Sequence, residues 1–380
     1  MKQKQSLSSV SVTILLCALT FTGTVLFMQH RYRKTEEKFQ RLAELDQYIQ
    51  QNFYTDYDED ALMDSMLKGY VSGLGDRYSS YMTPEEYDSL MTKEAGKTIG
   101  IGVTVVQNEE GYPEIIEVQE NSPAEKAGLH PEDVILAVEG EDVLTVGYTE
   151  SISRVRGEEG TAVNLKVRQD GTEKEISIVR ETFDVTTVAG QMLDGHIGYI
   201  QIVSFRENTA DQFQNALDEL LAQGADALIF DVRDNGGGLL SALEKMLDPL
   251  LPKGDIATAT YQGDETEVVL KSDAEELNLP MAVLVNGNSA SAAELFSASL
   301  RDFKQAKLVG TQTFGKGIMQ VTTRMPDGGG LTLTVATYQT TKSECYHGVG
   351  LTPDVIAELP DDAETDVQLE AAKKLFESGR

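Results

Sequence analysis

The sequence predicts an α/β fold that carries an inserted β-rich domain, a helical N-terminal region and one transmembrane helix at the N-terminus. Three observations lead to this prediction. An apolar stretch runs from Val10 to Met28, short alternating strands lie between residues 97 and 181, and buried strands alternate with amphipathic helices from residue 183 onward. Alternation of strands with helices favours a largely parallel sheet that is covered by helices.

Composition limits the classes of protein and of site. With 380 residues, 41% of them hydrophobic and 25% charged, the chain is long enough for two or three globular units. Its 32 basic and 62 acidic side chains give a net charge of −30, which repels phosphate backbones and argues against nucleic-acid binding. Cys17 and Cys345 cannot build a disulfide framework, and four scattered histidines without a CxxC or HExxH motif argue against zinc. We therefore expect neither a metal nor another cofactor.

The apolar stretch near the N-terminus is long enough to cross a bilayer. Val10–Met28 would span roughly 28 Å as a helix, and no charged residue lies between Gln5 and Gln29. We expect residues 1–9 to be a short cytoplasmic tail and residues 10–28 a retained signal anchor; the alternative is a signal peptide that is cleaved near residues 24–30. The charges after the stretch do not by themselves favour an external C-terminus, because they are basic: Arg31, Arg33, Lys34 and Lys38.

Residues 35–96 are expected to form a helical cap region. Apolar side chains recur at helical spacing in two segments before Gly73. The run Thr83-Pro84-Glu85-Glu86 predicts the start of a third, short helix, with Thr83 as the N-cap and Glu86 at the third helical position.

Residues 97–181 change to short alternating runs separated by glycine-containing turns, which predicts a small β-rich domain. Two helices interrupt these strands, a short one from Ser122 to Gly128 and a second over Tyr148–Val155. The predicted strands are Ile99–Val106, Glu114–Val118, Val134–Val138, Val163–Val167 and Lys174–Val179.

Residues 183–360 are expected to form the α/β core, and residues 361–380 a C-terminal helix. Continuous apolar runs predict buried strands, and the segments between them have helical periodicity. The predicted strands are Ile197–Val203, Asp226–Val232 and Met281–Val285, and the predicted helices are Thr209–Leu221, Leu239–Leu251 and Ala290–Phe303.

Small residues fill the segment Asn286–Glu294, between a buried strand and a helix. The first amides of a helix have no partner within it and lie at the positive end of its dipole. A serine at this junction can therefore have oxyanion donors beside it, which favours a nucleophile. The alternative is a simple N-cap in a closely packed turn.

Two further stretches are rich in glycine. Lys316 lies between Gly315 and Gly317, where its aliphatic stem can turn inward. Burial lowers the pKa of an amine and would make this lysine a general base; the alternative is an exposed lysine on a flexible hairpin. Asp231–Gly238 follows a buried strand, and its three glycines can present backbone amides to a ligand; the alternative is a strand-to-helix turn that needs positive φ.

Taken together and in this order, these stretches resemble the C-terminal processing peptidases, the tail-specific serine proteases of family S41. The resemblance covers about residues 40–360. Its motifs are D-L-R-x-N-x-G-G at Asp231–Gly238, with Val232 in place of Leu; S-A-S-A-[SA]-E at Ser289–Glu294; T-[FY]-G-K-G-x-x-Q at Thr313–Gln320; G-[VI]-x-P-D-V at Gly350–Val355, with Leu351 in the aliphatic position; and D-x-[YH]-S-x-Y-[LM]-x-P-E-E at Asp76–Glu86.

The resemblance implies a Ser–Lys dyad. The second serine of S-A-S, Ser291, would be the nucleophile, and Lys316, twenty-five residues later, would be its base. Gln320 would orient the lysine, because positions four apart on an extended strand share a face. The oxyanion donors would be the amides of Ala292 and Gly237. The family's core is similar to the crotonase and Clp protease fold.

The β-rich domain resembles a PDZ domain, and Ser122–Leu129 resembles the helix that follows the PDZ carboxylate-binding loop. PDZ domains add a peptide C-terminus to a sheet edge as a strand, while backbone amides hold its carboxylate. The groove helix would supply apolar contacts from Ile152 and Val155, and Arg156 would couple the domain to the core. The alternative for Arg156 is a surface pair with Glu158. The residues of the expected carboxylate-binding loop are Ile99, Gly100, Ile101, Gly102 and Val103.

These resemblances imply a membrane-anchored serine endopeptidase that cleaves proteins near their C-termini, with the PDZ domain capturing the tail and gating the site. Such peptidases generally work outside the cytoplasm and self-associate, so we expect an external catalytic domain and a homodimer. The alternatives are a tail receptor with an inactive core and a hydrolase of small esters or amides. The presence of Ser291, Lys316 and Gln320 argues against the inactive receptor. His347 is the one rival base, and its alternative is an ordinary loop histidine.

Overall fold

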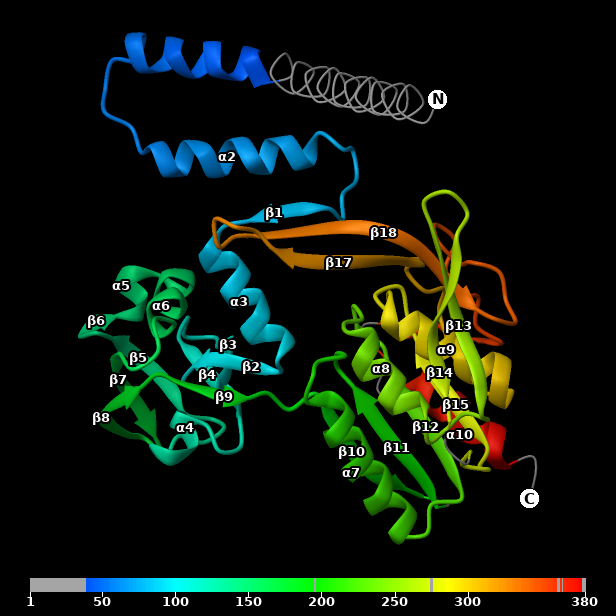
Figure 1. Ribbon diagram of the computed structural model, residues 1–380. Coiled ribbons are helices and arrows are strands. Elements are labelled where there is room, and N and C mark those ends of the chain that lie inside the picture. Colours follow the sequence, from blue (N-terminus) through cyan, green and yellow to red (C-terminus); the bar gives the residue numbers. More distant parts are fainter. Residues whose placement is uncertain (1–38, 195, 274–275, 361–362, 364, 378–380) are drawn as a thin grey trace, which may run out of the picture. The chain divides into compact units, whose positions relative to one another are not determined.

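The computed structural model describes residues 39–194, 196–273, 276–360, 363 and 365–377 (Figure 1). The chain divides into two compact units, residues 1–65 and residues 66–380. The predicted cytoplasmic tail and signal anchor lie outside the described residues. Among the helices that are described, none combines the length and the apolar character needed to cross a bilayer.

The helical N-terminal region has the predicted elements. Residues 39–52 are helical, and α2 (Glu59–Ser72) begins after Asp58, whose carboxylate accepts the amide of Ala61 at 3.0 Å. After β1 (Ser80–Met82), α3 (Pro84–Glu94) starts with a capping box in which Thr83 and Glu86 bind each other's backbone amides. The predicted cap of the third helix is confirmed.

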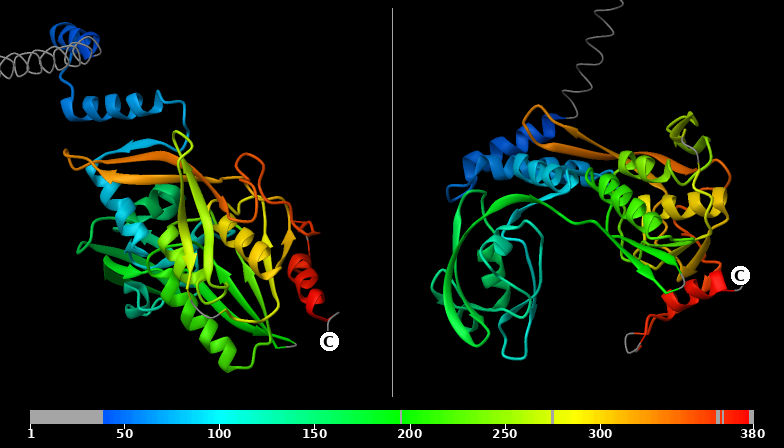
Figure 2. Two further views of the ribbon diagram at one scale, coloured as in Figure 1. Left: turned by 45° about the vertical axis from the view of Figure 1, so that its right-hand side comes forward. Right: turned by 90° about the horizontal axis from the view of Figure 1, so that it is seen from below.

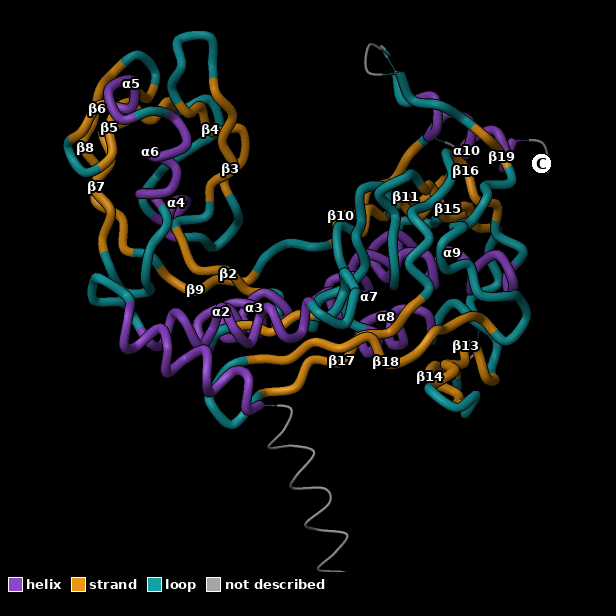
Figure 3. The backbone as a smooth tube through the Cα atoms, turned by 90° about the horizontal axis from the view of Figure 1, so that it is seen from above, coloured by secondary structure: helices purple, strands orange, loops and turns teal. Residues whose placement is uncertain are grey.

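The β-rich domain has its own sheet and its own apolar core. The sheet runs in the order β3-β4-β5-β7-β8, with β6 beside β5, and Figure 3 shows α5 and α6 against these strands. The segment predicted as one strand, Ile99–Val106, is two strands, because β2 pairs with β9 whereas β3 pairs with β4. The elements are β2 (Lys97–Gly100), β3 (Val103–Gln107), β4 (Pro113–Val118), α4 (Pro123–Lys126), β5 (Val134–Val138), β6 (Glu141–Asp142), α5 (Val143–Val146), α6 (Tyr148–Val155), β7 (Ala162–Gln169), β8 (Thr172–Val179) and β9 (Glu181–Asp184).

The core is built on a six-stranded sheet in the order β10-β11-β12-β15-β16-β19, parallel from β11 to β19. Helices α7, α8 and α9 bury apolar side chains against one face, and α10 packs against the other (Figure 2). Helix α8 ends earlier than predicted, since Pro249 cannot continue it. The elements are β10 (Val188–Leu193), β11 (Ile197–Ile202), α7 (Thr209–Ala222), β12 (Ala227–Asp231), α8 (Leu240–Leu247), β15 (Met281–Val285), α9 (Ala292–Lys304), β16 (Lys307–Gly310), β19 (Val355–Ile356) and α10 (Val367–Glu377).

A second, antiparallel sheet was not predicted from the sequence. It runs β1-β18-β13-β14, and β17 also pairs with β18, so the two form the long ribbon in Figure 1. Its strands lie on both sides of the serine turn in the sequence. The pairs β13–β14 and β17–β18 are hairpins, whereas β18 pairs with β1 and β13 over long separations. The elements are β13 (Gly254–Tyr261), β14 (Thr266–Ser272), β17 (Ile318–Arg324) and β18 (Gly330–Thr340).

Candidate active site

The glycine turn and the serine turn meet at the carboxyl ends of two neighbouring parallel strands. Asp231, the last residue of β12, pairs with Leu284 of β15. Beyond these strands, the Ala290 amide donates to the Asn235 carbonyl at 2.9 Å, and the Asn288 side chain donates to the Asp234 carboxylate at 2.8 Å. The carboxyl edge of a parallel sheet is the usual place for a functional site.

Only one of the two serines of the S-A-S run is free for chemistry. Ser289 is fully buried; its hydroxyl donates to the Val232 carbonyl at 2.7 Å and accepts the Asn286 amide at 3.0 Å. Ser291 is half-buried and immediately precedes α9, with φ 57° and ψ −119°. Such a conformation is strained for a residue with a Cβ, and strain of this kind gathers at functional sites.

The buried carboxylate of Glu294 joins the serine turn to the lysine loop. One oxygen accepts the amides of Ser291 at 3.0 Å and Lys316 at 2.7 Å. The other accepts the Thr313 hydroxyl at 2.5 Å and the Gly315 amide at 2.7 Å. Glu294 has no exposed surface, so these four charge-assisted bonds replace its hydration. They fix the backbones of Ser291 and Lys316 to one rigid group.

The two glycines beside Lys316 are required by packing. A Cβ on Gly315, which has φ +90°, would lie 2.9 Å from the Gly350 amide nitrogen. A Cβ on Gly317 would lie 3.0 Å from the Cys345 sulfur. The segment around the closing G-L-T-P-D-V run therefore crosses directly over the lysine loop.

Lys316 is half-buried, and three neighbours set the properties of its amine. Its Nζ lies 5.0 Å from the centre of the Tyr78 ring. Burial lowers the pKa of the amine, the positive charge of Arg77 lowers this pKa further, and the negative charge of Asp76 raises it. The upstream Asp76–Glu86 motif thus supplies the surroundings of the candidate base. The predicted inward lysine agrees with this position better than the alternative of an exposed hairpin.

Gln320 lies in β17, but Lys316 and Gln320 are not four positions apart on one regular strand, as the prediction for Gln320 assumed. Lys316 precedes the strand, and the pairing of β17 with β18 shifts register between Met319 and Gln320. Positions 316 and 320 therefore do not share a face through regular alternation. The Gln320 side-chain amide nitrogen is buried, and among the described residues it has no hydrogen-bond partner.

Of the two predicted oxyanion donors, one is free and one is occupied. No described group accepts the amide of Ala292, the first residue of α9. The Gly237 amide donates to the Asn235 side-chain oxygen at 2.8 Å. Gly237 still lies directly against the serine turn, because a Cβ on it would be 2.8 Å from Ser291 Cβ and 2.9 Å from the Ala292 nitrogen. In this conformation Ala292 is the available donor.

His347, the rival base, is exposed, and no hydrogen bond joins it to Ser291 within the described part of the chain. This position agrees with the alternative interpretation, in which His347 is an ordinary loop histidine. Among the described residues, no group of three or more His, Cys, Asp or Glu side chains converges as a metal site requires.

The predicted tail-binding residues line one pocket of about 490 Å³ in the β-rich domain. Its walls come from β2, the following loop, β3 and helix α6. Within the described residues the amides of Ile101 and Gly102 have no acceptor, so they are available to a bound carboxylate. The eight predicted residues in its lining are Ile99, Gly100, Ile101, Gly102, Val103, Ile152, Val155 and Arg156.

The alternative considered for Arg156, a surface pair with Glu158, is absent from the described structure. Arg180, which was not among the predicted residues, instead binds this segment. It is buried, and it donates to the carbonyls of Val155 at 2.9 Å and Arg154 at 2.8 Å. Arg156 is exposed in the wall of the groove.

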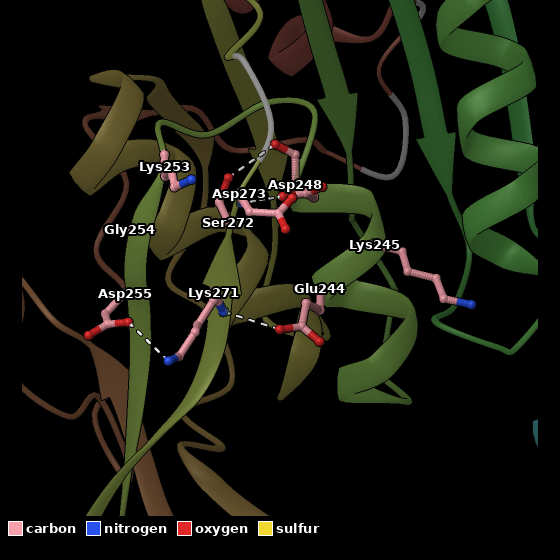
Figure 4. A pocket seen from close by; sticks show the side chains of 9 residues that line it. All are labelled: Glu244, Lys245, Asp248, Lys253, Gly254, Asp255, Lys271, Ser272 and Asp273. Carbon is pink, nitrogen blue, oxygen red and sulfur yellow. Dashed lines mark hydrogen bonds and ion pairs between the residues drawn. The ribbon is translucent and has the colours of Figure 1, made fainter.

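Other pockets differ from the candidate site in their chemistry. A pocket of about 420 Å³ beside α8, β13 and β14 has charged walls, but several of these groups pair with one another (Figure 4). Lys271 contacts Asp255 at 3.6 Å, and its amide donates to Glu244. A larger pocket, of about 1050 Å³, has Gly236 and Gly237 in its wall and therefore borders the serine turn.

Comparison with known proteins identifies the family. Residues 196–357 match Peptidase family S41, residues 99–179 match the PDZ domain, and residues 23–86 match the Activating protease CtpB N-terminal domain. The Carboxy-terminal processing protease CtpA of Bacillus subtilis (strain 168) is 36% identical over 364 residues, which cover 95% of this chain and 78% of that protein. The chain belongs to peptidase family S41. It is a serine peptidase of the C-terminal processing group, and it contains a PDZ domain.

Further relatives agree with this assignment. The Carboxyl-terminal-processing protease of Synechocystis sp. is 35% identical over 323 residues, covering 81% of this chain and 75% of that protein. The solved structure of a photosystem II D1 C-terminal processing protease is 26% identical, with a TM-score of 0.51 and coverage of 88% and 91% of the two chains. A putative S41 protease from Bacteroides fragilis is 18% identical with a TM-score of 0.58, covers 86% and 93%, and supports the fold alone.

In this S41 peptidase two residues that bind Ser291 or Lys316 were not among the predicted site residues. Glu294 closes the S-A-S-A-A-E run, where its acidic side chain in the first turn of a helix was a usable signal. Tyr338 lies in the unpredicted β18, and its hydroxyl is 3.2 Å from Ser291 Oγ. No local pattern identifies it, because β18 reaches the serine only through long-range pairing.

Proposed function

We propose that this chain is a membrane-anchored serine endopeptidase that cuts protein substrates near their C-termini with a Ser291–Lys316 dyad. The observation that carries the proposal is the Glu294 carboxylate, which accepts the backbone amides of both residues. A buried bridge of this kind pre-organises a nucleophile and a base, which is how positioning lowers a barrier.

The mechanism is acyl transfer. Neutral Lys316 takes the proton of the Ser291 hydroxyl while Oγ bonds to the substrate carbonyl carbon, and the Ala292 amide holds the oxyanion. The lysine then gives its proton to the departing amine. Water, activated by the same lysine, hydrolyses the acyl-enzyme. In the described conformation Nζ lies 5.0 Å from the centre of the Tyr78 ring, and we propose that it contacts Oγ when substrate is bound.

The PDZ groove is proposed to capture the substrate tail and to gate the site. The eight groove residues and the free amides of Ile101 and Gly102 suit a peptide carboxylate. Gln320 is proposed to orient Lys316, and Arg156 to couple the groove to the core. Gly237 would join the oxyanion hole if its amide exchanged the Asn235 oxygen for the substrate.

The remaining parts of the proposal follow from the sequence and the family. We infer an anchor at residues 10–28, a catalytic domain outside the cytoplasm and a homodimer. The core is expected to share the crotonase and Clp protease fold, in keeping with its parallel sheet and covering helices.

The proposal is tested with Ser291→Ala, Lys316→Ala and Lys316→Arg in the full chain. All three should remain folded and lose cleavage. Lys316→Arg should fail as well as Lys316→Ala because a guanidinium cannot act as the base. Proteins trapped by Ser291→Ala and sequenced at their C-termini should share a tail. Cleavage by Ser291→Ala would move the nucleophile to Ser289 or refute the dyad. Equal cleavage of tailed and tailless substrates would favour a hydrolase without tail recognition.

A further inference from the structure

The hydroxyl of Tyr338 touches the candidate nucleophile, and the mechanism above does not use it. This hydroxyl lies 3.2 Å from Ser291 Oγ and 3.1 Å from the Lys316 carbonyl oxygen. Tyr338 is 2% exposed, so little water competes for these contacts. One phenol therefore bridges the reacting atom of the serine and the backbone of the lysine.

The position of Tyr338 is fixed by its strand and by its ring. Its backbone amide donates to the Gly317 carbonyl at 3.1 Å, and it pairs with Ala259 of β13. Its ring meets the Tyr346 ring edge-on, with centroids 6.2 Å apart. The hydroxyl is thus held in place before substrate arrives, as an electrostatic catalytic group must be.

The protonation state suits a donor. Burial raises the pKa of Tyr338 far above its ordinary value, so the phenol keeps its proton at neutral pH. It cannot replace Lys316 as the base. The Tyr338 hydroxyl has a single proton, within reach of Ser291 Oγ at 3.2 Å and of the Lys316 carbonyl oxygen at 3.1 Å, so it donates to one of them at a time. Negative charge on Oγ favours donation to Oγ.

We propose that Tyr338 is a further catalytic residue whose hydroxyl holds Ser291 Oγ in place and donates to it while charge develops there. The inference rests on the proposed role of Ser291. In acylation the Oγ–H bond breaks as its proton passes to Lys316 Nζ and the Oγ–C bond forms. The C–N bond of the substrate then breaks, and the departing amine takes that proton from Lys316, while Tyr338 keeps its own proton. In deacylation a water molecule gives one proton to Lys316 as its oxygen bonds to the acyl carbon. The Oγ–C bond then breaks, and the proton passes from Lys316 to Oγ while Tyr338 again donates to Oγ.

The test compares Tyr338→Phe with Tyr261→Phe in the full chain. Phenylalanine keeps the ring and removes only the hydroxyl, and Tyr261 on the adjacent β13 is a matched control because its hydroxyl bonds to neither Ser291 nor Lys316. Peptide cleavage gives kcat and KM, and a fluorophosphonate probe gives the labelling rate of Ser291 across pH. In Tyr338→Phe, kcat and the labelling rate should fall about 10- to 100-fold, KM should stay within about 2-fold, and the pH of the rising limb should not move. Tyr261→Phe should match the parent.

Three results would overturn the inference or its foundation, and they are distinguishable. Labelling of Ser291 at the parent rate in folded Tyr338→Phe overturns the role of Tyr338 and leaves the dyad intact. If the rising limb of the pH profile moved in Tyr338→Phe while the limiting rate stayed unchanged, Tyr338 would only position Lys316. This result would also overturn the inference. Failure of the parent to label at Ser291 overturns the proposed function instead.

A measurement on the parent protein decides the question if Tyr338→Phe does not fold. In a structure of the full chain with a boronate bound to Ser291, the Tyr338 hydroxyl should lie within about 3.2 Å of Oγ. A separation beyond about 4 Å would overturn the inference.

Discussion

Glu294 is the residue on which the relative placement of Ser291 and Lys316 depends most directly. Its carboxylate accepts hydrogen bonds from four donors, and none of these donors bonds to another described acceptor. In Glu294→Gln the side-chain amide hydrogens would face the hydrogens of backbone amides. We predict that Glu294→Gln lowers kcat about 100-fold and the free energy of unfolding by about 2–4 kcal/mol. Steady-state cleavage and urea unfolding measure the two effects.

Ser297→Ala is the matched control for this prediction. It lies on the same helix, is equally buried, and loses only a hydroxyl that donates to the Ala293 carbonyl at 2.8 Å. It should keep parent activity. If Glu294→Gln retained full kcat, the carboxylate bridge would have no role in positioning the dyad.

The pH profile of cleavage should respond to the two charges near Lys316 in opposite directions. The lysine must lose its proton to act, so activity rises with pH through its lowered pKa. Arg77 lowers this pKa and Asp76 raises it. Arg77→Gln should therefore move the rising limb of kcat/KM to higher pH, and Asp76→Asn should move it to lower pH.

Each variant serves as the control for the other, because both change one charge in the same turn. If the rising limb of kcat/KM moved in the same direction in both variants, the shift would come from a rearrangement of the turn and not from the loss of one charge. No displacement in either variant would exclude Lys316 as the titrating base. High salt should reduce both displacements, since screening weakens exposed charges most.

At the scale of elements, the glycine turn supports the serine through close backbone approach. Gly237 has φ +97°, and an added Cβ would meet Ser291 Cβ and the Ala292 nitrogen within 2.9 Å. A methyl group there strains the turn and pushes on the start of α9. We predict that Gly237→Ala lowers kcat about 100-fold, measured by peptide cleavage.

Gly236→Ala separates this effect from a general loss of flexibility in the turn. Gly236 is the neighbouring residue, and a Cβ on it meets nothing within 4 Å. It should retain nearly all activity. Equal losses in both variants would argue that turn flexibility, and not the contact with Ser291, limits the reaction.

The elements that sequence reasoning found are those with a strong local signal. Buried apolar strands such as Ala227–Asp231, amphipathic helices such as Thr209–Ala222 and the capping box at Thr83 were predicted within a few residues. Strand β18 was missed because it alternates threonine with mixed side chains and pairs with β1 and β13 over long sequence separations. Strand β17, whose partner is β18, was missed with it. Tyr338 was missed with them.

The same distinction applies to the site. Ser291 and Lys316 could be proposed as site residues from the sequence because their motifs are local, and the structure explains the glycines around the lysine by packing against residues 345–350. The role of Glu294 and the contact of Tyr78 with Lys316 depend on tertiary contacts. No spacing rule supplies such contacts.

At the scale of the whole molecule, one ionic cluster joins the C-terminal helix to the glycine turn. Arg233 donates to Asp366 at 2.8 Å and 3.1 Å and also binds buried Asp231, which accepts the Tyr199 hydroxyl at 2.7 Å. Asp366 in turn accepts the amides of Gln368 and Leu369 at the start of α10. The helix that covers the second face of the sheet is therefore attached to the glycine turn that lies against Ser291.

Asp366→Asn tests whether this attachment stabilises the fold. Asparagine keeps an acceptor for the helix amides but removes the charge facing Arg233, so the free energy of unfolding at pH 7 should fall by about 1–2 kcal/mol. Its hydrogen bonds and the charge of Arg233 hold the pKa of Asp366 below its ordinary value, although burial opposes them. The contribution is present above the unfolded-state pKa and is lost as pH falls through the folded-state pKa. The difference between variant and parent should thus vanish in acid, as measured by urea unfolding across pH.

Glu370→Gln, which breaks an exposed ion pair on the same helix, should cost much less. A difference that persisted in acid, or equal losses in the two variants, would mean that α10 is held by its apolar face alone.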